Sequence, residues 1–271
     1  MRTALTIAGS DSGGGAGIQA DLKTFAALGV YGTSAITALT AQNTQEVRAV
    51  HVAPAAFVVA QIEAVVADLG CDAAKTGMLA TAEIVTAVAA AIRRLGLPNV
   101  VVDPVMVAKS GDHLLAASAV DAMRRDLLLV ARVVTPNIPE AEVLTGLTIR
   151  SLGDARAAAL ALRQLGARAV IVKGGHLDRP DIVDLLVDGD HADRVVELVA
   201  PRVSGVHTHG TGCTFAAAIA AHLALGDALE AAARAAQAYV AGAMRAGVPL
   251  GHGHRPLDHV WRVRPAILDE S

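Results

Sequence analysis

The sequence predicts an α/β fold in which a mostly parallel central sheet carries helices on both faces and has an antiparallel edge. Apolar runs of strand length alternate with longer segments of helical period through most of the 271 residues. Repeated strand–helix–strand crossovers produce a parallel sheet that is covered on both faces. No linker, low-complexity tract or longer repeat interrupts the pattern, so we expect residues 1–271 to form one domain.

The elements follow in order along the chain. The expected strands are Leu5–Ala8, Ser34–Leu39, Ala73–Lys75, Val100–Val102, Val133–Val134 and Ala169–Val172. The expected helices are Ile18–Leu28, Pro54–Asp68, Thr81–Leu95, Leu114–Leu127, Leu152–Leu165, Thr214–Leu225 and Asp227–Ala246. The segment Ile182–Leu198 differs, because two β-rich runs flank Asp188-Gly189-Asp190, a turn sequence typical of a hairpin. This hairpin supplies the expected antiparallel edge.

Composition argues against several classes of function. Apolar residues make up 53% and charged residues 18%, which favours a packed core over disorder. The net charge is −3 and the basic residues are scattered, so neither nucleic acid nor a membrane surface is an expected partner. Two cysteines are too few for a disulfide framework, which fits a cytoplasmic location. We expect no signal peptide in residues 1–8 and no membrane span in Ala228–Ala246, which charged side chains interrupt.

The first glycine-rich loop, Gly9–Gly17, lies between a predicted strand and a predicted helix. Within it, Gly15–Ala20 fits a G-x-G-x-x-A dinucleotide-binding pattern, but Ile36–Asn43 lacks the carboxylate that would bind ribose. The many glycines favour close approach of a ligand to the backbone, with a flexible turn as the alternative. Asp21, one turn into the helix, either points at that ligand or favours the helix start.

The second glycine-rich loop, Thr208–Cys213, runs into the apolar helix expected at Thr214–Leu225. Glycines before a helix leave N–H groups free, and the helix dipole adds positive charge, so this loop predicts an anion hole for a transferring phosphoryl group. Cys213 is expected at the helix N-terminus, where the pKa of a thiol is lowered. A buried structural cysteine is the alternative.

Seven segments together resemble the hydroxymethylpyrimidine/phosphomethylpyrimidine kinases of the ribokinase-like superfamily. These segments are Ala8–Lys23, Thr37–Thr44, Lys75–Leu79, Val102–Met106, Thr135–Glu142, Val172–His176 and Gly210–Cys213. The resemblance implies a ribokinase-like fold, ATP as phosphoryl donor and Mg²⁺ as cofactor. It implies two phosphorylations in thiamin biosynthesis, first of 4-amino-5-hydroxymethyl-2-methylpyrimidine and then of its monophosphate. It also implies a homodimer, and we expect a stand-alone kinase.

The resemblance further implies a role for each matching residue. Gln42 matches the glutamine whose amide binds the pyrimidine. Further positions that match the lining of the pyrimidine pocket are Gly9, Asp21, Thr40, Met78 and Val105. The residues that match the phosphate and metal machinery are Asn137 and Glu140 for magnesium through water, Asp103 in the same region, Lys173 for the phosphates, Gly210, Thr211 and Gly212 for the anion hole, and Cys213 as general base.

Several of these residues also have a purely structural explanation. Asn137 and Glu140 have the spacing of a helix cap and its capping partner. Lys173 fits a solvated strand end, and Met78 fits an ordinary core position.

The histidine pairs His207/His209 and His252/His254 fit solvated loop residues better than metal ligands, because no cysteine accompanies them and their spacing suits no standard site. One departure from the family pattern is Gly205-Val206-His207, where the family usually has Thr-x-Asn. This departure bears on nucleotide affinity and loop geometry but leaves the anion hole complete.

Three alternative functions follow from the same residues. A pyridoxine or pyridoxal kinase of the same superfamily would use the same phosphate machinery on another flat ring with a hydroxymethyl arm. A non-catalytic pyrimidine sensor would keep the pocket without the reaction. A dinucleotide-dependent oxidoreductase is disfavoured by the missing ribose carboxylate.

Overall fold

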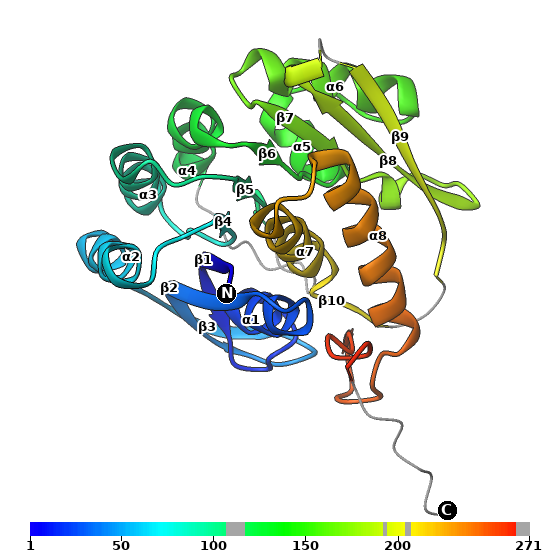
Figure 1. Ribbon diagram of the computed structural model, residues 1–271. Coiled ribbons are helices and arrows are strands. Elements are labelled where there is room, and N and C mark those ends of the chain that lie inside the picture. The colour runs from blue at the N-terminus through cyan, green and yellow to red at the C-terminus, as the bar shows by residue number, and fades with distance from the viewer. Residues whose placement is uncertain (107–116, 192–193, 204–206, 264–271) are drawn as a thin grey trace, which may run out of the picture.

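The computed structural model describes residues 1–106, 117–191, 194–203 and 207–263 (Figure 1). Within these residues, nine strands form one sheet in the order β3-β2-β1-β4-β5-β6-β7-β8-β9. The strands are β1 (Thr3–Asp11), β2 (Tyr31–Gln42), β3 (Val47–Val52), β4 (Ala73–Thr76), β5 (Val100–Val102), β6 (Val133–Val134), β7 (Ala169–Val172), β8 (Asp181–Asp188) and β9 (Arg194–Pro201). A separate parallel pair joins β10 (His207–His209) to β11 (Arg255–Pro256).

The six strands from β2 to β7 in the sheet order pair in parallel, so the predicted parallel sheet is confirmed. The expected hairpin forms the antiparallel strands β8 and β9 at one edge. The opposite edge is also antiparallel, because β3 returns against β2. Strand β3 is not among the strands expected from the sequence, because five of its six residues are exposed and show no alternation between buried and exposed positions.

Helices cover both faces of this sheet. They are α1 (Gly17–Ala27), α2 (Ala55–Leu69), α3 (Ala82–Leu95), α4 (Ala117–Ala122), α5 (Ile138–Thr145), α6 (Leu152–Gln164), α7 (Thr211–Leu225) and α8 (Leu229–Arg245). Short helical turns are η1 (Met123–Leu127, π-helical) and, with 3₁₀ geometry, η2 (Leu128–Val130), η3 (Gly174–His176) and η4 (Gly189–His191). The expected helix Leu114–Leu127 lies partly outside the described residues, and its described part divides into α4 and η1.

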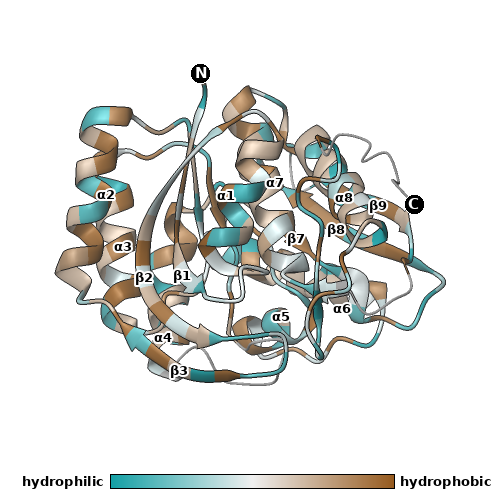
Figure 2. Ribbon diagram, turned by 90° about the horizontal axis from the view of Figure 1, so that it is seen from below, coloured by the Kyte–Doolittle hydropathy of each residue, from teal (hydrophilic) through white to brown (hydrophobic). Residues whose placement is uncertain are grey.

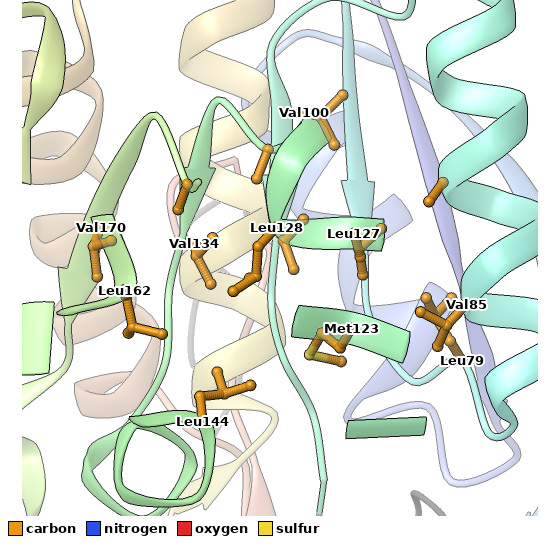
Figure 3. Close-up of a cluster of buried hydrophobic side chains, with 14 of the residues drawn as sticks. Leu79, Val85, Val100, Met123, Leu127, Leu128, Val134, Leu144, Leu162 and Val170 are labelled. Carbon is orange, nitrogen blue, oxygen red and sulfur yellow. The ribbon is translucent and has the colours of Figure 1, made fainter. Parts of the chain in front are cut away.

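Two apolar cores lie on the two faces of the sheet. The first packs the strands against α2 to α6, and Figure 3 shows part of it, with Val100, Val134 and Val170 from the strands among leucines from the helices. The second packs the opposite face against α1, α7 and α8, which lie side by side (Figure 2). With aromatics at only 2% of the chain, alanine and branched aliphatic side chains make up most of both cores, and Phe25, Phe215 and Tyr239 are buried in the second.

Helix α7 is buried around most of its circumference, because it lies between the sheet and α8 and also contacts α1. Alanines at Ala216–Ala218, Ala220 and Ala221 are all without exposure, and their small side chains allow close approach on every side. The helix begins at Thr211, three residues earlier than expected. Thr211, Gly212 and Cys213 therefore form its first turn instead of a preceding loop.

Candidate active site

The candidate site lies at the carboxyl ends of the six parallel strands, where folds of this kind usually bind their ligands. Asp11 and Gln42 end β1 and β2, and Asp103 and Lys173 directly follow β5 and β7. Asn137, which follows β6, forms an isolated bridge with Lys173. Polar side chains thus gather at the carboxyl ends of these parallel strands.

The N-terminus of α7 faces these strand ends. Gly210 caps the helix with a φ of 85°, and a Cβ there would lie 1.9 Å from the carbonyl oxygen of Gly15, so a side chain has no room. A Cβ at Gly212 would lie 3.3 Å from Lys173 Nζ and 3.7 Å from Asp103 Oδ2. The first-turn N–H groups have no partner within the helix. Free amides, an ammonium group and a carboxylate therefore converge at one place.

Lys173, Asp103 and Glu140 form a buried charge cluster. Lys173 Nζ donates to Asp103 Oδ1 at 3.1 Å, and Asp103 is 2% exposed. Burial lowers the pKa of Lys173, but the carboxylates of Asp103 and Glu140 outweigh it and raise that pKa above its ordinary value. Burial raises the pKa of Glu140 to about 7, with Asp103 adding to the shift and Lys173 opposing it. The lysine is thus not a solvated strand end and keeps its charge beside two carboxyl groups.

The expected lowering of the Cys213 pKa is wrong in this structure. Burial raises the pKa of the Cys213 thiol to about 11. The Lys75 ammonium and the Gly17 backbone N–H, which donates a hydrogen bond to the sulfur, lower it, whereas the carboxyl groups of Asp21 and Asp103 raise it. The free energy lost when the thiolate is removed from water exceeds the stabilisation that the helix N-terminus and the Lys75 ammonium provide.

Asp21 differs from its expected place on the wall of a pyrimidine pocket, because its side chain has no solvent exposure. Its Oδ2 accepts hydrogen bonds from Thr6 Oγ1 at 2.6 Å and from Lys75 Nζ at 2.9 Å. Lys75 is equally buried. Burial raises the pKa of Asp21, and the Lys75 charge opposes this shift. Asp21 and Lys75 thus form a buried ion pair near Cys213.

The other residues matched to the pyrimidine pocket lie on β1, β2 and the loops after β4 and β5. A Cβ at Gly9 would lie 3.0 Å from Met78 Cε, so these two positions are in direct contact. Thr40 Oγ1 lies 3.1 Å from Gln42 Oε1 and donates to the carbonyl oxygen of Ser10 at 2.8 Å. Val105 is partly buried and its N–H donates to the Asp103 carbonyl oxygen at 2.9 Å. Met78 is 7% exposed, which also suits a core residue.

Comparison with known proteins places the chain in a family. A family model described as phosphomethylpyrimidine kinase matches residues 11–258. The chain belongs to this kinase family. A hydroxymethylpyrimidine/phosphomethylpyrimidine kinase of Streptomyces coelicolor is 52% identical over 257 residues, which are 95% of this chain and 94% of that protein. The family resemblance of the sequence is thereby confirmed.

The chain is also similar to a bifunctional protein and to a pyridoxal kinase of known structure. The thiamine biosynthesis bifunctional protein ThiED of Geobacter sulfurreducens is 53% identical over 256 residues, which are 94% of this chain but 52% of that protein. The chain therefore spans about half the length of that relative. The structure of the pyridoxal kinase of Staphylococcus aureus in complex with AMP-PCP and pyridoxal is 38% identical, with a TM-score of 0.89 over 97% of this chain and 95% of that one. The expected ribokinase-like architecture is confirmed.

In this member of the kinase family, Asn137 and Glu140 form the helix cap that their spacing allowed. Asn137 Oδ1 accepts from the Glu140 N–H at 2.9 Å, and Glu140 Oε2 accepts from the Asn137 N–H at 2.8 Å. This reciprocal pair starts α5, a helix that the sequence analysis did not expect. Within the described residues, no three His, Cys, Asp or Glu side chains gather as a ready set of metal ligands. The magnesium role of both residues stays a prediction.

Two polar groups near the site had no role predicted from the sequence, and a third lies in surroundings other than those expected. Lys75 was matched as part of a segment but given no role, although a lysine within a fully buried strand requires a partner. Asp11, which the sequence places in the first glycine-rich loop at the end of a predicted strand, ends β1 but had no individual role. His209, expected to be a solvated loop histidine, is 7% exposed and lies against Asp11. His252 and His254 are exposed, as expected, whereas Gly205 and Val206 lie outside the described residues.

Proposed function

We propose that this chain transfers the terminal phosphoryl group of ATP to 4-amino-5-hydroxymethyl-2-methylpyrimidine and then to the resulting monophosphate. Membership of the family and the similarity to a thiamine biosynthesis bifunctional protein confirm the prediction of a phosphotransferase of thiamin biosynthesis. The observation that carries the proposed chemistry is the meeting of the α7 N-terminus, Lys173 and Asp103 at the ligand-binding edge of the sheet. Residues 1–271 would act as one kinase domain.

Phosphoryl transfer needs little covalent help from the protein and depends on position and charge. The N–H groups of Thr211, Gly212 and Cys213 are aimed out of the helix and would bind the oxygens of the migrating group, together with the Lys173 ammonium. The absence of a side chain at Gly210 and Gly212 lets phosphate oxygens reach the backbone. Each of these interactions strengthens as negative charge spreads over the transferring group.

A divalent cation fits the charge cluster on this side. Glu140 and Asp103 repel each other, which contributes to the raised pKa of Glu140, and a cation nearby would relieve that repulsion. Because the capping bonds occupy Asn137 Oδ1 and Glu140 Oε2, these residues would hold hydrated magnesium through its water ligands. The ion would supply charge neutralisation for the nucleotide phosphates.

Cys213 would accept the proton of the pyrimidine hydroxyl. In this step the hydroxyl oxygen bonds to the terminal phosphorus, the bond from phosphorus to the bridging oxygen breaks, ADP leaves and the proton moves to the thiolate. Burial raises the pKa of this thiol to about 11, and the neighbouring Lys75 charge opposes that shift. In the second phosphorylation the acceptor oxygen belongs to a phosphate that is already ionised, so no base is required.

Gln42 would bind the edge of the pyrimidine, since its amide can both donate and accept a hydrogen bond. Thr40 Oγ1 lies 3.1 Å from the side-chain oxygen of Gln42 on the same strand, and Gly9 and Met78 would supply apolar contacts to the ring. A ring bound between these groups would direct its hydroxymethyl arm toward Cys213.

A pyridoxal kinase is the second candidate, because the pyridoxal kinase of S. aureus shares this fold closely. Purified protein incubated with magnesium-ATP and each alcohol separates the two candidates. Mono- and then diphosphate of the pyrimidine, identified by mass, are the expected products, with slower turnover of pyridoxal. Preferred turnover of pyridoxal, or a pyrimidine product that stops at the monophosphate, would contradict the proposal.

The expectations of a homodimer and of a cytoplasmic location stay predictions. In the described part of the chain, no helix combines the length and the apolar character that a bilayer span requires. Size-exclusion chromatography with light scattering would report the mass of the assembly directly.

A further inference from the structure

A carboxylate and an imidazole join the two glycine-rich loops. Asp11 Oδ2 lies 2.8 Å from His209 Nε2, and the two side chains are 3% and 9% exposed. Asp11 ends β1 at the start of the first loop, whereas His209 immediately precedes Gly210 in the second. The contact therefore connects segments 198 residues apart in the sequence.

Asp11 also organises the first loop from within. Its Oδ1 accepts from the Gly13 N–H at 2.8 Å, and its Oδ2 accepts from the Gly15 and Ala16 N–H groups at 3.1 and 2.9 Å. One carboxylate thus binds three backbone amides and the histidine. Burial raises the pKa of Asp11, but the hydrogen bond and charge of His209 and these amides outweigh it and lower that pKa, so the group is a carboxylate that accepts every bond.

The ordered first loop then contacts the turn that opens α7. A Cβ on Gly210 would lie only 1.9 Å from the carbonyl oxygen of Gly15, so the backbones of the two loops are in contact at this point. The Gly17 N–H donates to the Cys213 sulfur. A change in the position of either loop therefore changes both the backbone amides at Gly210–Cys213 and the hydrogen bond to the thiol.

We propose that Asp11 and His209 are positioning residues, which hold the first glycine loop against the Gly210–Cys213 turn and thereby fix the amides and the thiol for phosphoryl transfer. This inference rests on the proposed kinase function and deepens it. Neither side chain touches the reacting atoms in this role. Because both phosphorylations use the same amides, loss of the pair slows both, whereas loss of the thiol slows mainly the first.

The test compares two replacements of His209 that differ in one property. His209→Gln keeps a donor near the Nε2 position, and His209→Phe keeps the ring volume without a donor. We expect His209→Phe to lower kcat of both phosphorylations by about tenfold or more, with KM for ATP changed less than about threefold, because misplaced amides weaken transition-state binding first. His209→Gln should recover most of this loss.

Asp11→Asn tests the other partner. Both oxygens of Asp11 accept hydrogen bonds, so the NH₂ group of an asparagine would face at least one N–H donor and could not accept its hydrogen bond. Combined with His209→Phe it should lower kcat by less than the product of the two single effects, because both variants lose the contact between Asp11 and His209, whereas Asp11→Asn also disturbs the bonds to the loop amides. Asp188→Asn is the matched control. Like Asp11, Asp188 is buried, at 6% exposure, and lies 3.1 Å from a histidine, His191. It pairs with Ala169, at the end of β7 that is opposite to Lys173 and the candidate site. It should lower the melting temperature without lowering kcat.

Alkylation of Cys213 by iodoacetamide in a Cys71→Ser background gives a readout that needs no turnover. His209→Phe should change the alkylation rate severalfold relative to His209→Gln, because the Gly17 contact with the sulfur is loosened. Equal alkylation rates and equal kcat in the two His209 variants, or a kcat loss that Asp188→Asn reproduces, would overturn the proposal. Absence of phosphoryl transfer in the unaltered protein would instead contradict the kinase function and leave the alkylation result to decide the role of the pair.

Discussion

Lys75 Nζ and Asp21 Oδ2 lie 2.9 Å apart, and neither side chain has any solvent exposure. One carboxylate oxygen, Asp21 Oδ1, is buried without a hydrogen-bond partner, so the desolvation of the pair is only partly compensated. Burial opposes the charge on Lys75, but Asp21, Cys213 and Asp103 outweigh it and raise the lysine pKa. The Lys75 charge thus interacts with Asp21, with Cys213 in the first turn of α7 and with Asp103.

Breaking this pair from one side should destabilise the protein strongly. Lys75→Met leaves Asp21 buried without a cation, and we expect the free energy of unfolding to fall by about 3–5 kcal/mol. Denaturant unfolding at pH 7 measures this change.

The double variant Asp21→Leu/Lys75→Met should regain most of that loss, because an apolar pair avoids the desolvation of both charges. Arg2→Ala is the control, since its exposed bridge to Asp72 is expected to contribute less than about 1 kcal/mol. A Lys75→Met variant as stable as the unaltered protein would contradict the importance of the pair.

Adding a methyl group at Gly212 should inhibit transfer without harming the fold. Its Cβ would project toward Lys173 Nζ, at 3.3 Å, where the phosphate is proposed to bind. We expect Gly212→Ala to lower kcat by about 10²-fold or more, because the methyl group would keep phosphate oxygens away from the amides and from Lys173, an effect as large as losing their stabilisation. The melting temperature should change little, because alanine suits a helix.

Gly153→Ala is the matched control, because Gly153 occupies the same second position of α6 and its Cβ would meet only Ser151 Oγ, at 3.5 Å. Steady-state kinetics on both variants decides the point. Equal kcat values would place the phosphate elsewhere.

Replacement of Cys213 should separate the two phosphorylations. Cys213→Ala removes the proposed base, so turnover of the alcohol should fall by about 10²-fold or more, whereas turnover of the monophosphate should change much less. Single-turnover assays with each substrate measure both rates. Equal losses in both reactions would remove the base assignment.

The pH dependence of the first phosphorylation follows from the same thiol. With a Cys213 pKa of about 11, the thiolate fraction in the free protein increases with pH between 7 and 9. We therefore expect kcat/KM for the alcohol to rise by up to about tenfold per pH unit in this range, and kcat/KM for the monophosphate to stay nearly flat. Parallel profiles for the two substrates would show that a different group titrates.

Glu140 should make the protein less stable above neutral pH. Its pKa is raised from 4.5 in an ordinary glutamate to about 7 in the folded protein, so the folded state favours the protonated form. This contribution to stability is fully present below pH 4.5 and is lost as pH rises through 7. Glu140→Gln keeps the capping pattern without the charge, and it should raise the free energy of unfolding by up to about 3 kcal/mol at pH 8 but not at pH 4.

Magnesium provides a further test of the same carboxyl group. If hydrated magnesium binds beside Glu140, millimolar magnesium should stabilise the unaltered protein at pH 8 and have little effect on Glu140→Gln. Thermal unfolding with and without magnesium, each at pH 4 and pH 8, gives all four comparisons. An identical response of both proteins at pH 8 would argue against a magnesium site there.

The sequence by itself determined the order of buried strands and helices, because hydrophobic period depends on neighbours only a few residues apart. Family-specific segments likewise determined Gln42, Lys173 and the Gly210–Cys213 turn as candidates. The exposed strand β3 carries no such period. Helix α5 was not expected, because the spacing of Asn137 and Glu140 indicated only a possible helix cap and not the helix that follows it.

Only the tertiary structure decided the charge state and partners of the buried groups. Burial raises the pKa of Cys213 although its place at a helix start predicted the reverse, and His209 lies against Asp11, 198 residues away. Desolvation and ion pairing depend on which distant atoms surround a side chain, and the local pattern does not contain this information.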